Sequence, residues 1–144
     1  MSETDFWNKT VRPAFAPYGD LVRIENRVGS GTPDVNYCLL RVEGWIELKK
    51  TYWPKKDNTK LLLPHFTDKQ LRWHERRHKA GGRTSLLAQI SHDYFLLPPW
   101  HLAEVFEGMV KQRYIECAVV HEFAKFPKAP LLRFLTGKGP VIPK

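Results

Sequence analysis

The alternation of apolar and polar residues predicts two neighbouring strands in the first third of the chain, at residues 33–40 and 45–49. Both segments are rich in β-branched and aromatic side chains, and Gly44 marks a short turn between them. This short connection favours a hairpin in which the two strands pair side by side. We expect the rest of the chain to be organised around this hairpin.

The predicted hairpin brings chemically active side chains together. Successive side chains of a strand point to opposite faces, so Glu47 and Lys49 project to one face while Ile46 and Leu48 project to the other. Pairing of the strands also brings Asp34 close to Glu47. Two carboxylates and one amine on a small patch of sheet can hold a hard divalent cation and activate a water beside it.

A helix and a strand are expected before the hairpin. The helix is predicted from Glu3 to about Val11, with Ser2 as its N-cap, and it should end or kink at Pro13. Residues 21–27 alternate in polarity and predict a strand.

Helices and strands also alternate after the hairpin. Thr67 and Gln70 fit a capping box, which predicts a helix that runs to Ala80 and ends at Gly81. Four further segments have a clear pattern: two buried strands at 84–90 and 94–97, a helix at 100–110 and an apolar run at 114–120. This order predicts an α/β fold, a single domain with a central mixed β-sheet flanked by helices.

The last residues differ in composition from the rest. We expect residues 1–124 to form the domain and residues 125–144 to form a basic tail. The tail contains several Pro and Gly and no acidic residue, so it is expected to be poorly helical and mobile. Contact with a partner subunit or with DNA is the other interpretation of the tail.

The overall charge points to a polyanionic partner. The 144 residues carry a formal net charge of +8 with a sequence pI near 9.6, which favours nucleic acid over a membrane surface; a solvated basic face is the alternative. The sequence has no apolar run long enough to span a membrane and no signal-peptide pattern at its acidic start. Cys38 and Cys117 lie in apolar surroundings and are expected to be buried thiols, which suggests a cytoplasmic protein.

Asp34 followed by Glu47-Leu48-Lys49 resembles the signature of the PD-(D/E)xK nucleases, and the glycine-containing flank at 29–34 and the helix at 70–82 are also similar. Within that superfamily the chain most resembles the Holliday junction resolvases of archaeal and phage type. The resemblance covers about the first two thirds of the chain. It implies a restriction-endonuclease-like αβββαβ core and a homodimer that cleaves four-way or other branched DNA, in a prokaryotic or phage-infected cell.

The resemblance also implies roles for individual residues. Asp34 and Glu47 would bind Mg²⁺ or Mn²⁺, with the backbone carbonyl of Leu48 as a third ligand. Lys49 would orient or deprotonate the attacking water. Glu3 matches an acidic residue that approaches the metal from the first helix, although it is equally well explained as a helix-capping charge.

Residues expected to contact DNA are basic or can donate hydrogen bonds: Ser30, Lys50, Lys55, Lys56, Lys60, Gln70, Arg72, Arg76 and Arg77. Residues 50–60 interleave lysines with aromatic side chains, which suits phosphates and exposed bases. Two other assignments stay open. Gln70 is already explained by its capping role, and Glu25 is either a second candidate for the extra acid or the ion-pair partner of a neighbouring arginine.

A competing motif lies on the predicted basic helix. His74, Glu75 and His78 match H-E-x-x-H, in which two histidines bind zinc and the glutamate is the general base of a peptidase. The intervening residues are two arginines, whereas the zinc helix of such peptidases is usually apolar, and a third histidine expected at position 84 is instead Thr84. The remaining alternatives are a flap- or end-processing nuclease of the same superfamily and a DNA-binding module without catalysis.

Overall fold

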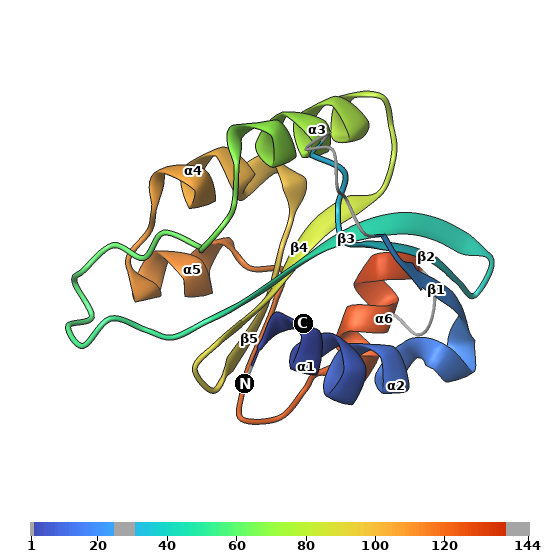
Figure 1. The fold of residues 1–144 in the computed structure, drawn as a ribbon, viewed down its shortest axis with the longest axis horizontal. Coiled ribbons are helices and arrows are strands. Elements are labelled where there is room, and N and C mark those ends of the chain that lie inside the picture. Colours follow the sequence, from blue (N-terminus) through green and yellow to red (C-terminus); the bar gives the residue numbers. More distant parts are fainter. Residues whose placement is uncertain (1, 25–30, 138–144) are drawn as a thin grey trace.

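Six strands form one mixed sheet at the centre of the computed structural model, which describes residues 2–24 and 31–137 (Figure 1). In spatial order they are β1 (Gly19–Arg23), β2 (Val35–Leu39), β3 (Val42–Thr51), β4 (Thr84–Ile90), β5 (Asp93–Leu97) and β6 (Val120–Phe123). The pair β3 and β4 is parallel and the other neighbours are antiparallel. The predicted α/β fold with a central mixed sheet is confirmed.

Helices cover both faces of this sheet (Figure 1). One face carries α1 (Glu3–Phe6), α2 (Arg12–Phe15) and α6 (Lys128–Thr136), and the other carries α3 (Asp68–Lys79), α4 (Leu102–Glu107) and α5 (Lys111–Cys117). Each face has its own apolar core. Ile46 and Leu48 of β3 belong to the core under α1, α2 and α6, whereas Leu86, Ala88 and Ile90 of β4 belong to the core under α3, α4 and α5.

The hairpin between β2 and β3 forms as predicted, with Val35 opposite Ile46. Its turn lies at Leu40 and Arg41, whose φ angles of 49° and 69° are in the left-handed region that tight two-residue hairpin turns require. Gly44 was expected in the turn, but it lies inside β3. A side chain there would collide with the ring of Tyr37 on the paired strand, so this glycine serves packing and not the turn.

The first helical segment continues past Pro13, so the expectation that it ends at this proline is wrong. A π-helical stretch (Trp7–Val11) leads into α2, and a 3-10 turn (Ala16–Tyr18) follows it. In the π-helical stretch the Arg12 N–H donates to the Trp7 carbonyl, five residues earlier. The backbone hydrogen bonds before Pro13 already follow the π-helical pattern. The missing N–H of this proline therefore interrupts no regular α-helical hydrogen bonding.

The expectation that residues after 125 are poorly helical is also wrong. Pro130 lies in the first turn of α6, where an N–H has no partner within the helix, and Gly137 ends the helix with a left-handed φ of 65°. Leu131 and Leu135 are buried in the core with α1 and α2. Residues 138–144 lie outside the described part of the chain.

Two smaller expectations need correction. The apolar run at 114–120 is the second half of α5 followed by the start of β6, because its buried residues Tyr114 and Cys117 face the core at helical spacing. Cys117 is buried as expected, but Cys38 is exposed on β2, where alternate side chains point outward. In the described ranges, no helix has the length and hydropathy that a membrane span requires.

Candidate active site

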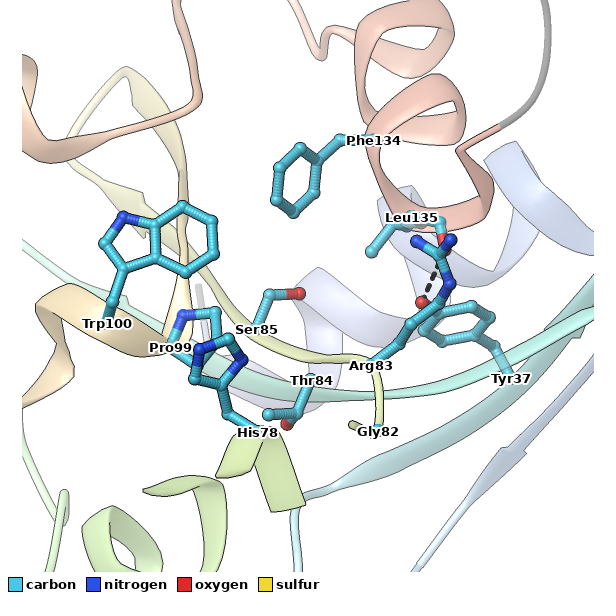
Figure 2. A pocket seen from close by; sticks show the side chains of 10 residues that line it. All are labelled: Tyr37, His78, Gly82, Arg83, Thr84, Ser85, Pro99, Trp100, Phe134 and Leu135. Carbon is cyan, nitrogen blue, oxygen red and sulfur yellow. Dashed lines mark hydrogen bonds between the residues drawn. The ribbon is translucent and has the colours of Figure 1, made fainter. Parts of the chain in front are cut away.

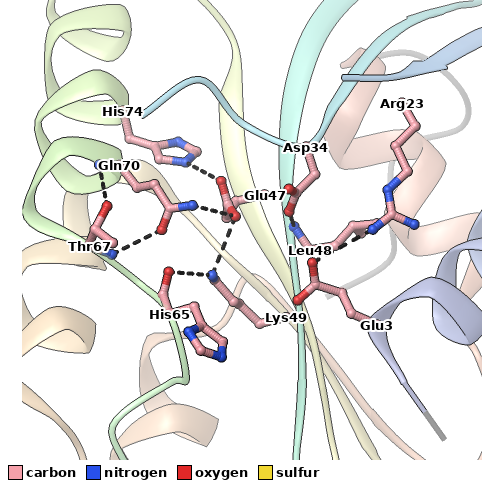
Figure 3. Close-up of polar contacts among 10 residues, drawn as sticks. All are labelled: Glu3, Arg23, Asp34, Glu47, Leu48, Lys49, His65, Thr67, Gln70 and His74. Carbon is pink, nitrogen blue, oxygen red and sulfur yellow. Dashed lines mark hydrogen bonds and ion pairs between the residues drawn. The ribbon is translucent and has the colours of Figure 1, made fainter. Parts of the chain in front are cut away.

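The polar site forms where the start of β2, the middle of β3, α1 and α3 approach one another (Figure 3). Asp34 directly precedes β2 and lies level with Glu47 across the hairpin, since the next pair in the ladder is Val35 and Ile46. The Leu48 N–H donates to Asp34 Oδ2 at 2.9 Å, which fixes this carboxylate against β3. The charge of Asp34 so close to Glu47 disfavours ionisation of the Glu47 carboxyl and contributes to its raised pKa.

Glu47 is buried, but its neighbours form hydrogen bonds with only one of its two carboxyl oxygens. Its Oε2 accepts a hydrogen bond from Gln70 Nε2 at 3.2 Å and lies 3.5 Å from Lys49 Nζ, but its Oε1 has no hydrogen-bond partner. Burial raises the pKa of Glu47 well above its ordinary value, the nearby charge of Asp34 raises it further, and Lys49 opposes the shift only in part. The environment therefore favours the protonated carboxyl, and a bound cation would favour the carboxylate instead.

Lys49 lies beside Glu47, as the alternation of the strand predicted, and only 3% of its surface is exposed. Its ammonium donates to the backbone carbonyl of His65 at 3.0 Å. His65 has a φ of 58°, a left-handed conformation that costs about 1–2 kcal/mol for a residue with a Cβ. The sequence held no signal for this carbonyl, which orients the lysine from a loop far along the chain.

Gln70 both caps α3 and contacts the carboxyl site. Its Oε1 accepts from the Thr67 N–H at 2.9 Å and its own N–H donates to Thr67 Oγ1 at 3.2 Å, so the predicted capping box is present. Because the amide oxygen caps the helix, the amide nitrogen points to Glu47 (Figure 3). One side chain thereby couples the start of α3 to the carboxyl pair.

Glu3 reaches the site from α1, on the other side of β3 (Figure 3). Burial raises its pKa, and the charge of Asp34 raises it further, while Lys49 and Arg23 oppose the shift. An Arg23 nitrogen lies 3.9 Å from Glu3 Oε1. The N-cap of this helix is Ser2 in a capping box with Asp5, so capping does not depend on the Glu3 side chain.

His74 contacts the site from the α3 side, and sequence reasoning considered it only within the zinc motif. Its ring is fully buried, its Nδ1 lies 2.6 Å from Thr84 Oγ1, and its Nε2 lies 3.9 Å from Glu47 Oε1. Burial, reinforced by the charge of Lys49, lowers the pKa of His74 to about 4. When Thr84 donates to Nδ1, the neutral ring presents an Nε2–H to the carboxyl oxygen that has no partner.

These residues fit a hard divalent cation in their chemistry. Two carboxyls whose pKa values are raised by burial and by Asp34, and one buried oxygen without a partner, are groups that a cation would satisfy. Within the described residues, Glu3, Asp34 and Glu47 do not bring three oxygens within 4.8 Å of one another. Mg²⁺ commonly takes only one or two carboxylates and retains several waters, so the Asp34–Glu47 pair is sufficient.

The expected DNA contacts are distributed over a loop and a helix. Lys55, Lys56 and Lys60 are exposed in the loop after β3, and Arg72 and Arg76 are exposed on α3. Ser30 and Glu25 lie outside the described residues.

Three further side chains of this surface are held by neighbours. Arg77 lies 4.6 Å from the ring of Trp73, and Lys50 lies 4.3 Å from that of Tyr52. Trp53 is one of the aromatic residues of 50–60 that were expected to suit exposed bases. Its ring instead packs against the core, and its indole N–H donates to Asp93 Oδ2 at 2.8 Å.

The zinc-peptidase motif does not assemble in the described part of the chain. His74 faces Glu47 and Thr84, whereas His78 is exposed beside the ring of Trp100, and neither belongs to a group of three potential metal ligands. Glu75 is exposed.

His101, Glu104 and Cys117 do form such a group. However, both oxygens of Glu104 accept hydrogen bonds from Arg113, at 2.6 and 2.9 Å. An ion pair therefore already accounts for this cluster.

Comparison with known proteins supports the fold. No protein-family model matches the sequence, and no curated protein matches it. Among solved structures, the chain is similar to Hjc from Archaeoglobus fulgidus, a Holliday junction resolvase from an archaeal hyperthermophile. The two share 14% sequence identity with a TM-score of 0.53, over 90% of this chain and 97% of the archaeal one. The chain therefore has the fold of this resolvase over nearly its whole length.

Proposed function

We propose that this protein is a metal-dependent DNA endonuclease that hydrolyses phosphodiesters, and more specifically a Holliday junction resolvase. The observation that carries the proposal is the buried carboxyl of Glu47, which has one oxygen without a partner among the described residues. It lies across the hairpin from Asp34 and 3.5 Å from the ammonium of Lys49. A module that only binds DNA gains nothing from buried carboxylates at a site that would face phosphate, because they would repel it. The fold likeness to an archaeal resolvase supports the same conclusion.

Asp34 and Glu47 would hold Mg²⁺ or Mn²⁺, with the Leu48 carbonyl as the third protein ligand. The ion, when bound, polarises the scissile phosphate and lowers the pKa of an attacking water. Lys49 orients that water and neutralises charge that builds on the phosphate, and the His65 carbonyl keeps its ammonium in place. Glu3 completes the acidic site from α1.

The exposed basic residues of the loop after β3 and of α3 would bind the DNA backbone. The loop lysines at 55, 56 and 60 and the exposed arginines of α3 supply positive charge, and the whole chain carries a net charge of +8. Phosphate contacts of this kind position the substrate but carry no sequence information. We therefore expect recognition of DNA shape, with affinity that falls steeply as salt is added.

A four-way junction needs two symmetric cuts, which a two-fold symmetric protein provides. We propose a homodimer whose two sites lie on a common basic face. Light scattering at micromolar concentration, with and without junction DNA, should give twice the mass of the chain. A monomer under both conditions would remove the resolvase assignment while leaving the nuclease.

The decisive experiment is cleavage of a labelled four-way DNA junction beside a linear duplex of the same sequence, in Mg²⁺ and in EDTA. Paired symmetric nicks in the junction alone are expected, and they should be lost in EDTA and in Asp34→Asn. Asp20→Asn is the matched control, because Asp20 is an exposed aspartate on β1 away from the site.

Metal-dependent cutting of both substrates would retain the endonuclease and exclude the junction preference. Binding without cutting, equal in Mg²⁺ and EDTA, would reject the endonuclease in favour of a DNA-binding module.

A further inference from the structure

A cavity of about 150 Å³ opens at the end of the sheet where β4 begins and β5 ends. Its lining includes the aromatic side chains of Trp100 and Phe134, the basic side chains of His78 and Arg83, and the hydroxyl of Ser85 (Figure 2). These residues come from α3, the start of β4, the 3-10 turn Pro99–His101 and α6. The cavity thus lies between the two helical layers, outside the carboxyl site.

The aromatic wall of this cavity is unusually accessible. Trp100 is 57% exposed, although the preceding Pro99 is buried and anchors the turn that presents the indole. The ring of His78 lies 5.7 Å from the Trp100 ring, and Phe134 projects from α6 toward the same space (Figure 2). An exposed indole at the mouth of a cavity is a surface on which another planar ring can stack.

Two polar side chains line the cavity beside its aromatic rings. Ser85 is only 2% exposed, and its hydroxyl lies on the cavity wall (Figure 2). The guanidinium of Arg83 forms no ion pair or hydrogen bond within the described ranges, and it lies against Gly137 at the end of α6. A hydroxyl on the cavity wall and an exposed guanidinium beside aromatic rings suit a ligand that is planar, polar at its edge and negatively charged.

We propose that this cavity takes one unpaired nucleotide of the DNA substrate. The base stacks on Trp100 with Phe134 beside it, the Ser85 hydroxyl bonds the base edge, and Arg83 binds the phosphate. The cavity has a volume of about 150 Å³ and the exposed indole of Trp100 at its mouth, which suits one stacked base. The inference rests on the proposed DNA cleavage and extends it to how a branch is distinguished from plain duplex.

The cavity is connected to the carboxyl site through α3 and β4. Thr84 lines the cavity and bonds His74, whose other ring nitrogen faces Glu47. Gln70 at the site and His78 at the cavity are eight residues apart on α3, which is about 12 Å along the helix axis. At about 3.4 Å per nucleotide along one strand, the unpaired nucleotide lies about three to four nucleotides from the cut.

The test is binding of a short single-stranded oligonucleotide and of its duplex in EDTA, measured by fluorescence anisotropy for the wild type and three variants. Trp100→Ala should weaken single-strand binding about 5- to 150-fold, the range expected for loss of one base stack. Duplex binding should change less than about threefold. Phe123→Ala is the matched control, because Phe123 is 62% exposed on the edge strand β6, away from the cavity.

Ser85→Ala removes only the buried hydroxyl and should preserve the fold. It should alter the ratio of affinities for oligo-dT and oligo-dA while leaving duplex binding unchanged. Equal single-strand affinities for Trp100→Ala, Phe123→Ala and the wild type, or an unchanged dT to dA ratio in Ser85→Ala, would overturn the proposal.

The failure of this inference can be distinguished from failure of the proposed function. The same protein preparations are assayed for Mg²⁺-dependent cleavage of the four-way junction. Wild-type cleavage together with no effect of Trp100→Ala on single-strand binding overturns the nucleotide cavity alone. No cleavage by the wild type, together with the expected loss in Trp100→Ala, overturns the endonuclease and retains the cavity as a nucleotide site.

Discussion

Two clusters of ionisable side chains in this protein look alike in composition but differ in electrostatics. The first is the site of Glu47, with Asp34 and Lys49; the second is Glu104 with Arg113. Glu47 is fully buried and has an oxygen without a partner, and burial raises its pKa. Glu104 is partly exposed, both of its oxygens are paired, and the hydrogen bonds from Arg113 lower its pKa.

This difference distinguishes a site that can bind a cation from one whose carboxylate is already paired. A carboxylate paired with arginine has its charge neutralised and gains little from a cation. A buried carboxyl with a raised pKa is destabilising when it ionises alone, and a bound cation would relieve that cost. A buried carboxyl oxygen without a hydrogen-bond partner, and not the number of acidic residues, identifies the candidate active site.

The largest expected difference is in catalysis. Glu47→Gln should reduce junction cleavage in Mg²⁺ by about 10²- to 10⁴-fold, since it removes a metal ligand and a charge next to Lys49. Glu104→Gln should change the rate less than about threefold, because an exposed ion pair contributes little. Single-turnover cleavage of labelled junction measures both. Equal losses in the two variants would contradict the assignment of the site.

His74 should have a smaller effect, on metal affinity. His74→Leu removes the Nε2–H that faces Glu47, and we expect half-maximal cleavage to need about 10- to 100-fold more Mn²⁺. His74→Gln, whose amide can donate from a similar position, should restore part of the affinity. His92→Leu, at an exposed histidine next to β5, is the control. An unchanged Mn²⁺ requirement in His74→Leu would mean that the histidine only packs.

The pH dependence of stability should have opposite signs in the two clusters. The folded protein holds the Glu47 proton to a higher pH than the unfolded chain, in which the pKa of this carboxyl is near 4.5. The contribution of Glu47 to the free energy of unfolding is therefore full below pH 4.5 and is lost as pH rises through the raised pKa. Glu104 has a lowered pKa, and its contribution is lost as pH falls. His74, with a pKa of about 4, gives stability that rises between about pH 4 and 6.5 in every variant that keeps it.

In EDTA at pH 8, Glu47→Gln should therefore melt above the wild type, because the buried amide does not ionise at any pH of the experiment. This difference in melting temperature should vanish near pH 4. Mn²⁺ at 100 times its Kd should stabilise the wild type by about 2.7 kcal/mol and reverse the order of the two proteins. Melting curves followed by circular dichroism measure this, and a Glu47→Gln protein that melts lower at pH 8 without metal would refute it.

Local patterns in the sequence were sufficient for several parts of the site. The period of two along a strand predicted that Glu47 and Lys49 share a face, and their 3.5 Å separation confirms it. The capping box of Thr67 and Gln70 followed from residue spacing and is present. Both depend on neighbours a few positions apart, where backbone geometry alone decides which side chains meet.

Composition without position gave wrong expectations at the two ends of the chain. Pro13 was expected to end the first helix, but the π-helical turn before it already rearranges the hydrogen bonds. Pro130 and Gly137 suggested a poorly helical tail, yet they occupy the first turn and the end of α6, where each is compatible with a helix. The buried Leu131 and Leu135 then stabilise α6 by packing, which residue counts do not reveal.

The sequence by itself determined the class of fold, the basic character, the hairpin and the shared face of Glu47 and Lys49. Only the tertiary structure decided which distant groups join them: the His65 carbonyl on Lys49, His74 opposite Glu47, and Glu3 from the first helix. It also decided that Glu47 is buried and lacks a partner for one oxygen, while Glu104 is satisfied by Arg113. The reason is physical: local spacing depends on backbone geometry, whereas burial and charge balance depend on how remote segments pack together.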